Sequence, residues 1–401
     1  MLATRRLLYA VILLFLATAL IGAGKVSAQG PGPTPQPQPG QASPGEEEDP
    51  GQGRESCLRC HRREDLFLTF PSGETISVTV QEEAYFGSVH GQHGTQGYKC
   101  IRCHQEKESY PHPELEVESL REYSLSRYTA CSRCHPAMYD ETLDSVHQQA
   151  RERGQDQAAI CTDCHKHHDI QRVYAEDSNQ LLEGRREWSV QVCAACHNQI
   201  YQFYRESIHG SSLFSEGNPD VPTCIDCHGV HDLSGPMDGS FRLESPKVCA
   251  DCHTDENMMV SYELSTDVME TYVDDFHGTT VVLSQAGANP ENINEPVCSD
   301  CHGIHQIEKT EGPESIAVKE NLLETCQRCH PQAPPDFPDA WMSHYIPSLE
   351  KTPGVYIARL IYRILIPVTI GGMAMVVVMD FVRSKLNKGA SKSGNNPPSD
   401  E

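Results

Sequence analysis

Basic side chains are scarce in this chain of 401 residues: Lys and Arg number 32 against 56 Asp and Glu, which gives a formal net charge of −24. Such a surplus of negative charge argues against nucleic acid and acidic lipid surfaces as partners. It serves solubility, or it orients a basic redox partner. The sequence also contains no nucleophile triad, phosphate-binding loop or nucleotide-binding fingerprint, so the enzyme classes that depend on them are not indicated.

No cysteine stands alone. All eighteen form nine Cys-x-x-Cys pairs, and a histidine directly follows each pair. Two thiols three positions apart can both add to the vinyl groups of one porphyrin, and the next imidazole then reaches the iron, so each pentapeptide is typical of a haem c attachment site. The expected attachment residues are Cys57, Cys60, Cys100, Cys103, Cys131, Cys134, Cys161, Cys164, Cys193, Cys196, Cys224, Cys227, Cys249, Cys252, Cys298, Cys301, Cys326 and Cys329. The expected proximal iron ligands are His61, His104, His135, His165, His197, His228, His253, His302 and His330.

Zinc ribbons and disulfide frameworks also use paired cysteines, but neither requires the histidine. A thioredoxin-like redox site is not indicated, because no βαβ pattern surrounds any pair. The sequence therefore predicts nine haem c groups. Apolar residues make up 38% of the chain, and two terminal apolar segments inflate that share. We therefore expect the haems to form the core, and the middle of the chain to be unfolded without them.

Of the twenty histidines, eleven lie outside the nine motifs, and most of these follow a repeat. After odd-numbered motifs a histidine stands in stretches such as Ser207-Ile-His209, and after even-numbered motifs one stands three residues beyond the motif histidine, as in His228-Gly-Val-His231. The second motif has Lys107 at that offset, and His112 is the nearest substitute. The expected distal ligands are His90, His112, His147, His168, His209, His231, His277, His305 and His344, with His93 and His167 spare. His93 is the alternative to His90.

The chain therefore reads as a two-haem module repeated about four times, followed by one terminal haem. A histidine three residues beyond a proximal ligand cannot fold back across its own porphyrin, so we expect it to bind a neighbouring haem. Two imidazoles on every iron would leave no open position for a substrate. This favours an electron carrier over an enzyme.

The ends of the chain predict export and a membrane anchor. Residues 1–28 have the charged, apolar and small-residue parts of a signal peptide, with an uncleaved anchor as the alternative. Residues 29–54 form a Pro- and Gly-rich linker expected to be disordered, and residues 55–345 form the haem domain. Residues 355–381 are long and apolar enough to span a bilayer, and a basic tail at 382–401, expected to be disordered, places the C-terminus in the cytoplasm. A buried hydrophobic helix is the alternative to the span.

The predicted fold is mostly α-helix and coil around the haems, with little strand and one C-terminal transmembrane helix. Short helices should present the motifs, because Pro, Gly and Asn recur too often for long ones. A β-hairpin is expected where residues 66–70 and 75–80 alternate around a Pro-Ser-Gly-Glu turn. The span contains no histidine, so it cannot bind a haem b through imidazole.

The Ser-x-His-Gly stretches, the Cys-His-Gly-x-His-Asp tails, the hairpin ending at Val80, and the stretch from Tyr262 through His277 into Cys298 resemble bacterial multihaem c-type cytochromes with doubled motifs, which act in anaerobic respiration and extracellular electron transfer. The similarity covers residues 57–345. It implies a helix-and-coil fold around a haem chain, and as partners a membrane quinol-oxidising cytochrome b and other c-type cytochromes. The chain departs from the pattern at Asp275, where serine is usual, and at Lys166, where glycine is usual. Its single final helix argues against independent quinol oxidation.

The leading interpretation is an electron relay on the extracytoplasmic side, periplasmic or at the cell surface. We expect the ninth haem, with His330 and His344 as its ligands, to lie nearest the membrane and to exchange electrons with a quinol-linked partner, because His344 is close in sequence to the span. The alternatives are a multihaem reductase of a small oxyanion or nitrogen compound at one open haem, and a structural unit of a haem filament.

Overall fold

The computed structural model describes residues 54–93, 98–107, 110–176, 178, 180–235, 239–287, 295–309, 321–340, 344, 346–350 and 352–392. These residues belong to one unit, 54–401. The predicted signal peptide, the linker up to residue 53 and the last residues of the tail, 393–401, lie outside the described residues.

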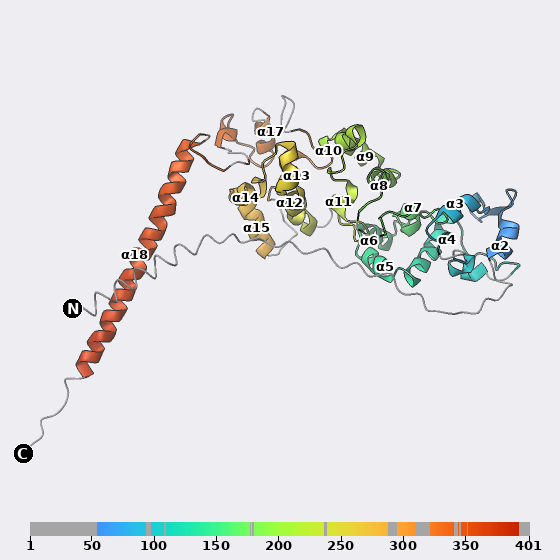
Figure 1. Cartoon of the computed structure of the whole chain (residues 1–401), viewed down its shortest axis with the longest axis horizontal. Coiled ribbons are helices and arrows are strands. Elements are labelled where there is room, and N and C mark those ends of the chain that lie inside the picture. The colour runs from blue at the N-terminus through green and yellow to red at the C-terminus, as the bar shows by residue number, and fades with distance from the viewer. Residues whose placement is uncertain are drawn as a thin grey trace, which may run out of the picture. The chain divides into compact units, whose positions relative to one another are not determined.

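The described chain is mostly helical with little strand, as predicted (Figure 1). Strands β1 (Phe67–Thr69) and β2 (Thr75–Ser77) pair antiparallel with Phe67 opposite Ser77, which confirms the predicted hairpin. The first half of the unit contains α2 (Arg54–His61), α3 (Glu82–Gly87), η1 (Cys100–Arg102), η2 (Gln105–Lys107), α4 (Leu120–Arg127), η3 (Tyr128–Arg133), α5 (Pro136–Leu143), α6 (Val146–Glu152) and α7 (Cys161–His165). The second half contains α8 (Arg185–Ala194), α9 (Asn198–Glu206), α10 (Ile208–Ser211), η4 (Ser212–Glu216), α11 (Cys224–His228), α12 (Gly239–His253), α13 (Glu256–Met259), η5 (Val260–Tyr262), α14 (Val268–Val273), α15 (Phe276–Gly287), α16 (Cys298–His302), α17 (Leu322–Gln327), η7 (Phe337–Ala340) and α18 (Pro353–Lys392).

Odd and even motifs occupy different places in the helices. Odd motifs lie at or beyond the end of a helix, as in α8, which ends at Ala194 inside the fifth motif. Three of the even motifs form a five-residue helix of their own, α7, α11 and α16. Each of these begins with a carboxylate cap: the backbone N–H before the first cysteine donates to the Asp two residues after that cysteine, for example Thr223 N to Asp226 Oδ2 at 2.6 Å.

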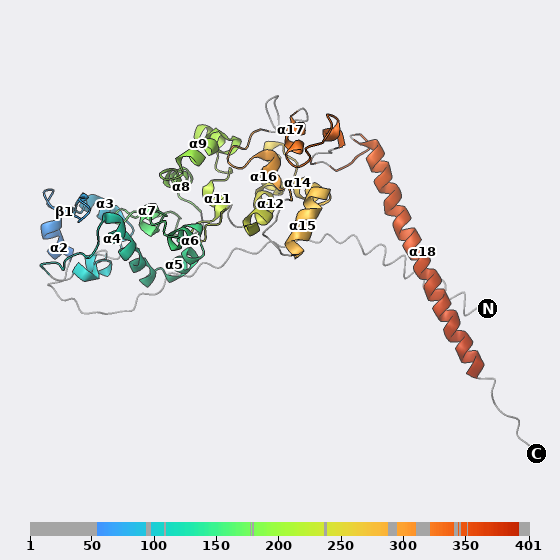
Figure 2. The same ribbon diagram turned by 180° about the vertical axis from the view of Figure 1, so that it is seen from behind.

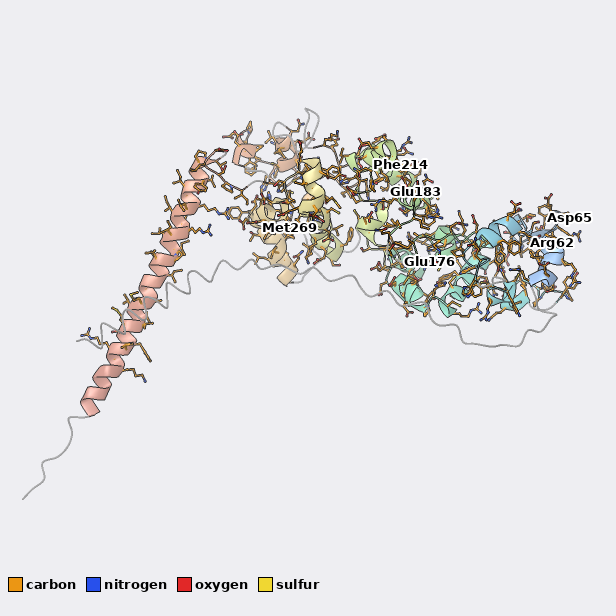
Figure 3. The ribbon with its side chains drawn as sticks, in the orientation of Figure 1. Arg62, Asp65, Glu176, Glu183, Phe214 and Met269 are labelled. Carbon is orange, nitrogen blue, oxygen red and sulfur yellow. The ribbon has the colours of Figure 1, made fainter. Side chains whose placement is uncertain are left out.

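The apolar core of the described residues is divided into small clusters. One joins Val190, Tyr204 and Leu213, with Phe214 packed against it. The other joins Leu243, Tyr272, Val281 and Val297, with Met269 packed against it. Figure 3 labels Phe214 and Met269, which lie in separate parts of the unit. Clusters of three or four buried residues are small for a chain of this length, which fits the prediction that the chain supplies little core of its own.

Helix α18 is the one described helix that is long and apolar enough to cross a membrane, over residues 353–385, and no part of its apolar window is buried. It is drawn without interruption in Figures 1 and 2. The helix continues to Lys392, beyond the predicted end of the span. Residues 382–392 are therefore helical, which corrects the prediction of a disordered tail from residue 382: no helix breaker occurs before Gly389.

Candidate cofactor site

Each of the nine motif histidines has one other histidine ring opposite it, and these nine partners are the nine expected distal ligands. The ring centres lie 6.1–6.4 Å apart in every pair. The pairs are His61–His112, His104–His168, His135–His90, His165–His231, His197–His147, His228–His305, His253–His209, His302–His344 and His330–His277.

This separation fits one metal ion between two imidazoles. A bond of about 2 Å from metal to nitrogen on each side, with about 1 Å from nitrogen to ring centre, puts the ring centres about 6 Å apart. Rings in direct stacking contact lie closer, as do His93 and Tyr98 at 4.3 Å. The paired cysteines stand beside the same rings, and all eighteen are free of disulfide bonds. The donor set therefore fits a haem c iron with two axial histidines.

The two spare histidines have other neighbours. His93 stacks on Tyr98, and His167 lies edge-on to His168 at 5.0 Å. It is His90, not His93, that faces a motif histidine. Within the described ranges, no three His, Cys, Asp or Glu side chains converge as they would around a bare metal ion.

The modules exchange histidines in both directions. Each Ser-x-His histidine faces the odd motif of the following module, as His209 faces His253. Each tail histidine faces the even motif of the preceding module, as His231 faces His165 and His305 faces His228. A tail histidine therefore never lies opposite the motif histidine three residues before it. Every interior pair joins two modules.

The ends of the series need different residues. The first motif has no preceding module, and His112, which follows no repeat, faces His61. No later module supplies a tail histidine to the eighth motif. Instead, His344 faces its histidine, His302. This corrects the assignment of His344 to the ninth motif, because His330 faces His277 of the fourth module. Because a tail histidine faces the even motif of the preceding module, the second motif needs none: no even motif precedes it. Lys107 stands at that position.

A serine cap positions the forward-facing histidines. Ser207 is buried; its Oγ donates to the Tyr204 carbonyl and accepts from Gly210 N, so it starts the helix that carries His209. Ser88 and Ser145 make the same pair of bonds. A Cβ added at Gly210 would lie 2.0 Å from the Tyr204 carbonyl oxygen, so only glycine fits there. The equivalent atoms are as close at Gly91 and Gly278.

Backbone hydrogen bonds connect the forward and backward histidines of successive modules. The amide after each capping serine donates to the carbonyl two residues beyond a tail histidine: Val89 to Ile170, Val146 to Leu233 and Ile208 to Ile307, at 2.8–2.9 Å. These bonds hold each Ser-x-His stretch against the tail of the next module. Distal histidines for two different motifs are thus fixed by one contact.

Tyrosine and arginine side chains hold the even motifs in place. Tyr204 Oη donates to the Pro222 carbonyl and Tyr272 Oη to the Pro296 carbonyl, each at 2.8 Å and two residues before an even motif. Arg186 forms an ion pair with Asp226 at 3.0 Å. The equivalent pairs are Arg121–Asp163 and Arg242–Asp300. Sequence reasoning missed these residues; the Tyr five positions before each of His90, His209 and His277 is the signal that could have found the tyrosines.

The cysteines of consecutive motifs are neighbours along the whole series. Within a module the first cysteines lie close together: Cys57 by Cys100, Cys131 by Cys161, Cys193 by Cys224 and Cys249 by Cys298. Between modules, burial raises the pKa of Cys164 to about 11, with the nearby Cys193 as the next cause. Burial likewise raises the pKa of Cys103, Cys227 and Cys301, and cysteines of the following motif add to each shift. The nine motifs therefore form one continuous series of neighbours.

Ring nitrogens and charge states suit iron ligation. The Nδ1 atoms of His61 and His228 lie 2.8 and 3.0 Å from the carbonyls of Val78 and Ser234, which leaves Nε2 to bind a metal. Burial, followed by the facing His253, lowers the pKa of His209 to about 4. That imidazole is therefore neutral at pH 7, as a ligand must be.

Comparison of the chain with protein-family models, with curated proteins and with solved structures finds no match.

Proposed function

We propose that this chain is a membrane-anchored multihaem c-type cytochrome that passes electrons along nine bis-histidine haems outside the cytoplasm. The observation that carries the proposal is the set of nine histidine pairs, each with the ring separation that one iron requires and each beside a Cys-x-x-Cys pair. Bound haem would supply the redox chemistry, one electron per iron. The protein contributes attachment, axial ligands and spacing.

Continuity of the motifs supports transfer along the chain. Cysteines of every pair of consecutive motifs are neighbours, both within modules and between them. Histidines exchanged between modules and the backbone bonds beside them join adjacent modules. Two imidazoles held for each iron favour electron transfer over substrate chemistry, because with haem bound they would leave no open position for a substrate.

Helix α18 contacts the chain near residues that serve the eighth and ninth motifs. Arg359, in the second turn of α18, forms an ion pair with Asp274 at 3.1 Å, and Asp274 stands three residues before His277, which faces His330. Thr271 Oγ1, three residues before Asp274, lies 3.4 Å from Nδ1 of His344, which faces His302. These contacts support the hypothesis that this end of the series lies nearest the bilayer and that its last haem, the ninth, exchanges electrons with a quinol-linked membrane partner. Basic residues after the span favour a cytoplasmic C-terminus, with the haems on the other side.

The test is electron paramagnetic resonance of the purified full-length protein in detergent, combined with its haem content. The proposal predicts nine haems per chain, with low-spin ferric signals that account for nearly all of the iron. A substantial high-spin ferric population would contradict it and favour the reductase alternative, which requires an open iron.

A further inference from the structure

The histidine opposite the first motif differs from the other eight distal candidates. His112 is exposed, whereas the others are at least partly buried. It lies in residues 110–117, which form no regular helix or strand, while His90, His147 and His209 lie at serine-capped helix starts. Tyr110, beside it, is 88% exposed. Solvent therefore reaches the distal side of the first site.

The two sides of this site are held by different contacts, and on the distal side the His112 ring lies edge-on to Tyr110 at 6.1 Å. On the proximal side, His61 Nδ1 contacts the Val78 carbonyl at 2.8 Å, and Val80 N donates to the His61 carbonyl. On the distal side, the Lys107 ammonium donates to the Pro113 carbonyl at 3.3 Å, next to His112, in an exposed bond. An exposed hydrogen bond to a surface loop stabilises its geometry only weakly.

We propose that His112 is an exchangeable ligand, and that the first haem is the place where this protein binds a small neutral molecule at iron. This rests on the proposed function. With haem attached at the first motif, the incoming molecule would replace His112 at the iron, one bond forming as another breaks, with no electron gained or lost. Lys107 is a positioning residue: it holds the loop on which His112 lies.

Charge defines the class of ligand. The His112 loop continues through Glu114, Glu116 and Glu118, all exposed, and Lys107 is the nearby basic residue that contacts it. An acidic approach disfavours nitrite, sulfite and other anions. Negative charge on the loop does not repel uncharged diatomic molecules or small neutral nitrogen bases. The ligand is therefore a neutral molecule of one of these two classes.

Carbon monoxide is the probe, added to the fully reduced full-length protein in detergent, with stoichiometry and rate read from the absorbance change. Wild type should bind close to one molecule per nine haems. His112→Ala should still bind one, at least ten-fold faster, because the same iron is then open. Lys107→Met should bind one, about three- to ten-fold faster than wild type, as expected for the loss of one hydrogen bond.

The matched control is His231→Ala, which removes an interior distal histidine and should bind two, one at the first haem and one at the newly opened iron. If wild type binds none and His112→Ala binds one, His112 is an ordinary ligand and the proposal is overturned. If wild type binds one and His112→Ala binds two, the exchangeable site lies elsewhere, which also overturns it. Haem content separates the two claims: nine haems without carbon monoxide binding leaves the electron-transfer proposal standing.

Discussion

The interior of the motif series and its two ends meet the same requirement with different residues. From the second motif to the seventh, each motif histidine is faced by a histidine from a neighbouring module, held by a serine cap or by a backbone bond between modules. At the ends no such module exists, and His112 and His344 come from segments outside the repeat. The interior modules are therefore ordered by exchanging histidines with each other. At each end a segment outside the repeat supplies the histidine, as terminal caps do in other repeat proteins.

Removing one haem attachment site should give the largest difference in stability between the interior and the ends of the motif series. Cys224→Ser with Cys227→Ser abolishes attachment at the sixth motif, where His228 and His305 join the third and fourth modules. We expect a loss of about 4 kcal/mol or more in unfolding free energy, as for loss of a structural metal. Thermal unfolding should split into two transitions.

The matched change is Cys57→Ser with Cys60→Ser at the first motif. It should leave one transition and a smaller loss, because the first site joins no two modules. Mass spectra should show eight haems on both variants. Equal losses of unfolding free energy would mean that the exchange of histidines between modules does not stabilise the protein.

A single methyl group should disturb one interior site. Gly210→Ala places Cβ 2.0 Å from the Tyr204 carbonyl oxygen, so the helix start that carries His209 must shift. We expect destabilisation of about 2–3 kcal/mol. A high-spin signal should also appear from about one haem in nine, since the change disturbs one axial ligand.

Gln148 occupies the equivalent position in the second module, and it serves as the control. Gln148→Ala should lower the free energy of unfolding by at most about 1 kcal/mol, because it removes side-chain bonds to Arg151 and Glu152 but forces no atom against a carbonyl. A spin state in Gly210→Ala identical to wild type would show that the glycine does not position His209.

The sequence predicted a large part of this arrangement because each proposed haem site is encoded in a short stretch of chain. A Cys-x-x-Cys-His motif would attach and ligate a haem within five residues, and the Ser-x-His stretch carries its own cap, so both can be recognised without tertiary contacts. The hairpin at 66–80 was equally local, with its turn residues between two alternating runs.

The pairing of His344 depends on contacts distant in sequence, and there the prediction was wrong. His344 follows the ninth motif in the chain but faces His302, because packing between modules decides which histidine lies opposite a motif histidine. The Arg186–Asp226 pair escaped prediction for the same reason, since forty residues separate its members. The end of α18 was missed because the composition of residues 382–392 is polar, whereas the helix continues through them.

The arginine–aspartate pairs allow a milder test inside the repeat. Asp226 accepts from Thr223 N and Thr223 Oγ1 and pairs with Arg186, and the carboxylate is partly shielded. Asp226→Asn should cost about 1–2 kcal/mol, because a helix cap and a charge-assisted bond weaken together. Denaturant unfolding measures the effect.

An ion pair near the N-terminal end supplies the comparison. Asp65, labelled in Figure 3, pairs with Arg63 at 2.7 Å where both side chains are exposed. Asp65→Asn should leave the unfolding midpoint unchanged, because water already screens that pair. If both variants behave alike, the interior pair has no special role.

The smallest expected effect is an increase in stability at Lys166. Lys166 ends α7 with φ 65° and ψ −169°, a conformation almost confined to glycine, and Gly229 and Gly303 occupy the same place after α11 and α16. Lys166→Gly should stabilise the protein by about 1 kcal/mol, the relieved strain exceeding the added freedom of the unfolded chain. Lys166→Ala should give no such gain in thermal unfolding, since alanine retains Cβ.

Haem content is the most direct test of the whole account. An intact mass spectrum of the full-length protein, purified from its membrane under denaturing conditions, counts covalently attached groups. The account predicts the polypeptide plus nine haems, because eighteen cysteines form nine attachment sites and nine histidine pairs stand beside them. A polypeptide mass without haem, or a protein that carries zinc in its place, would contradict it.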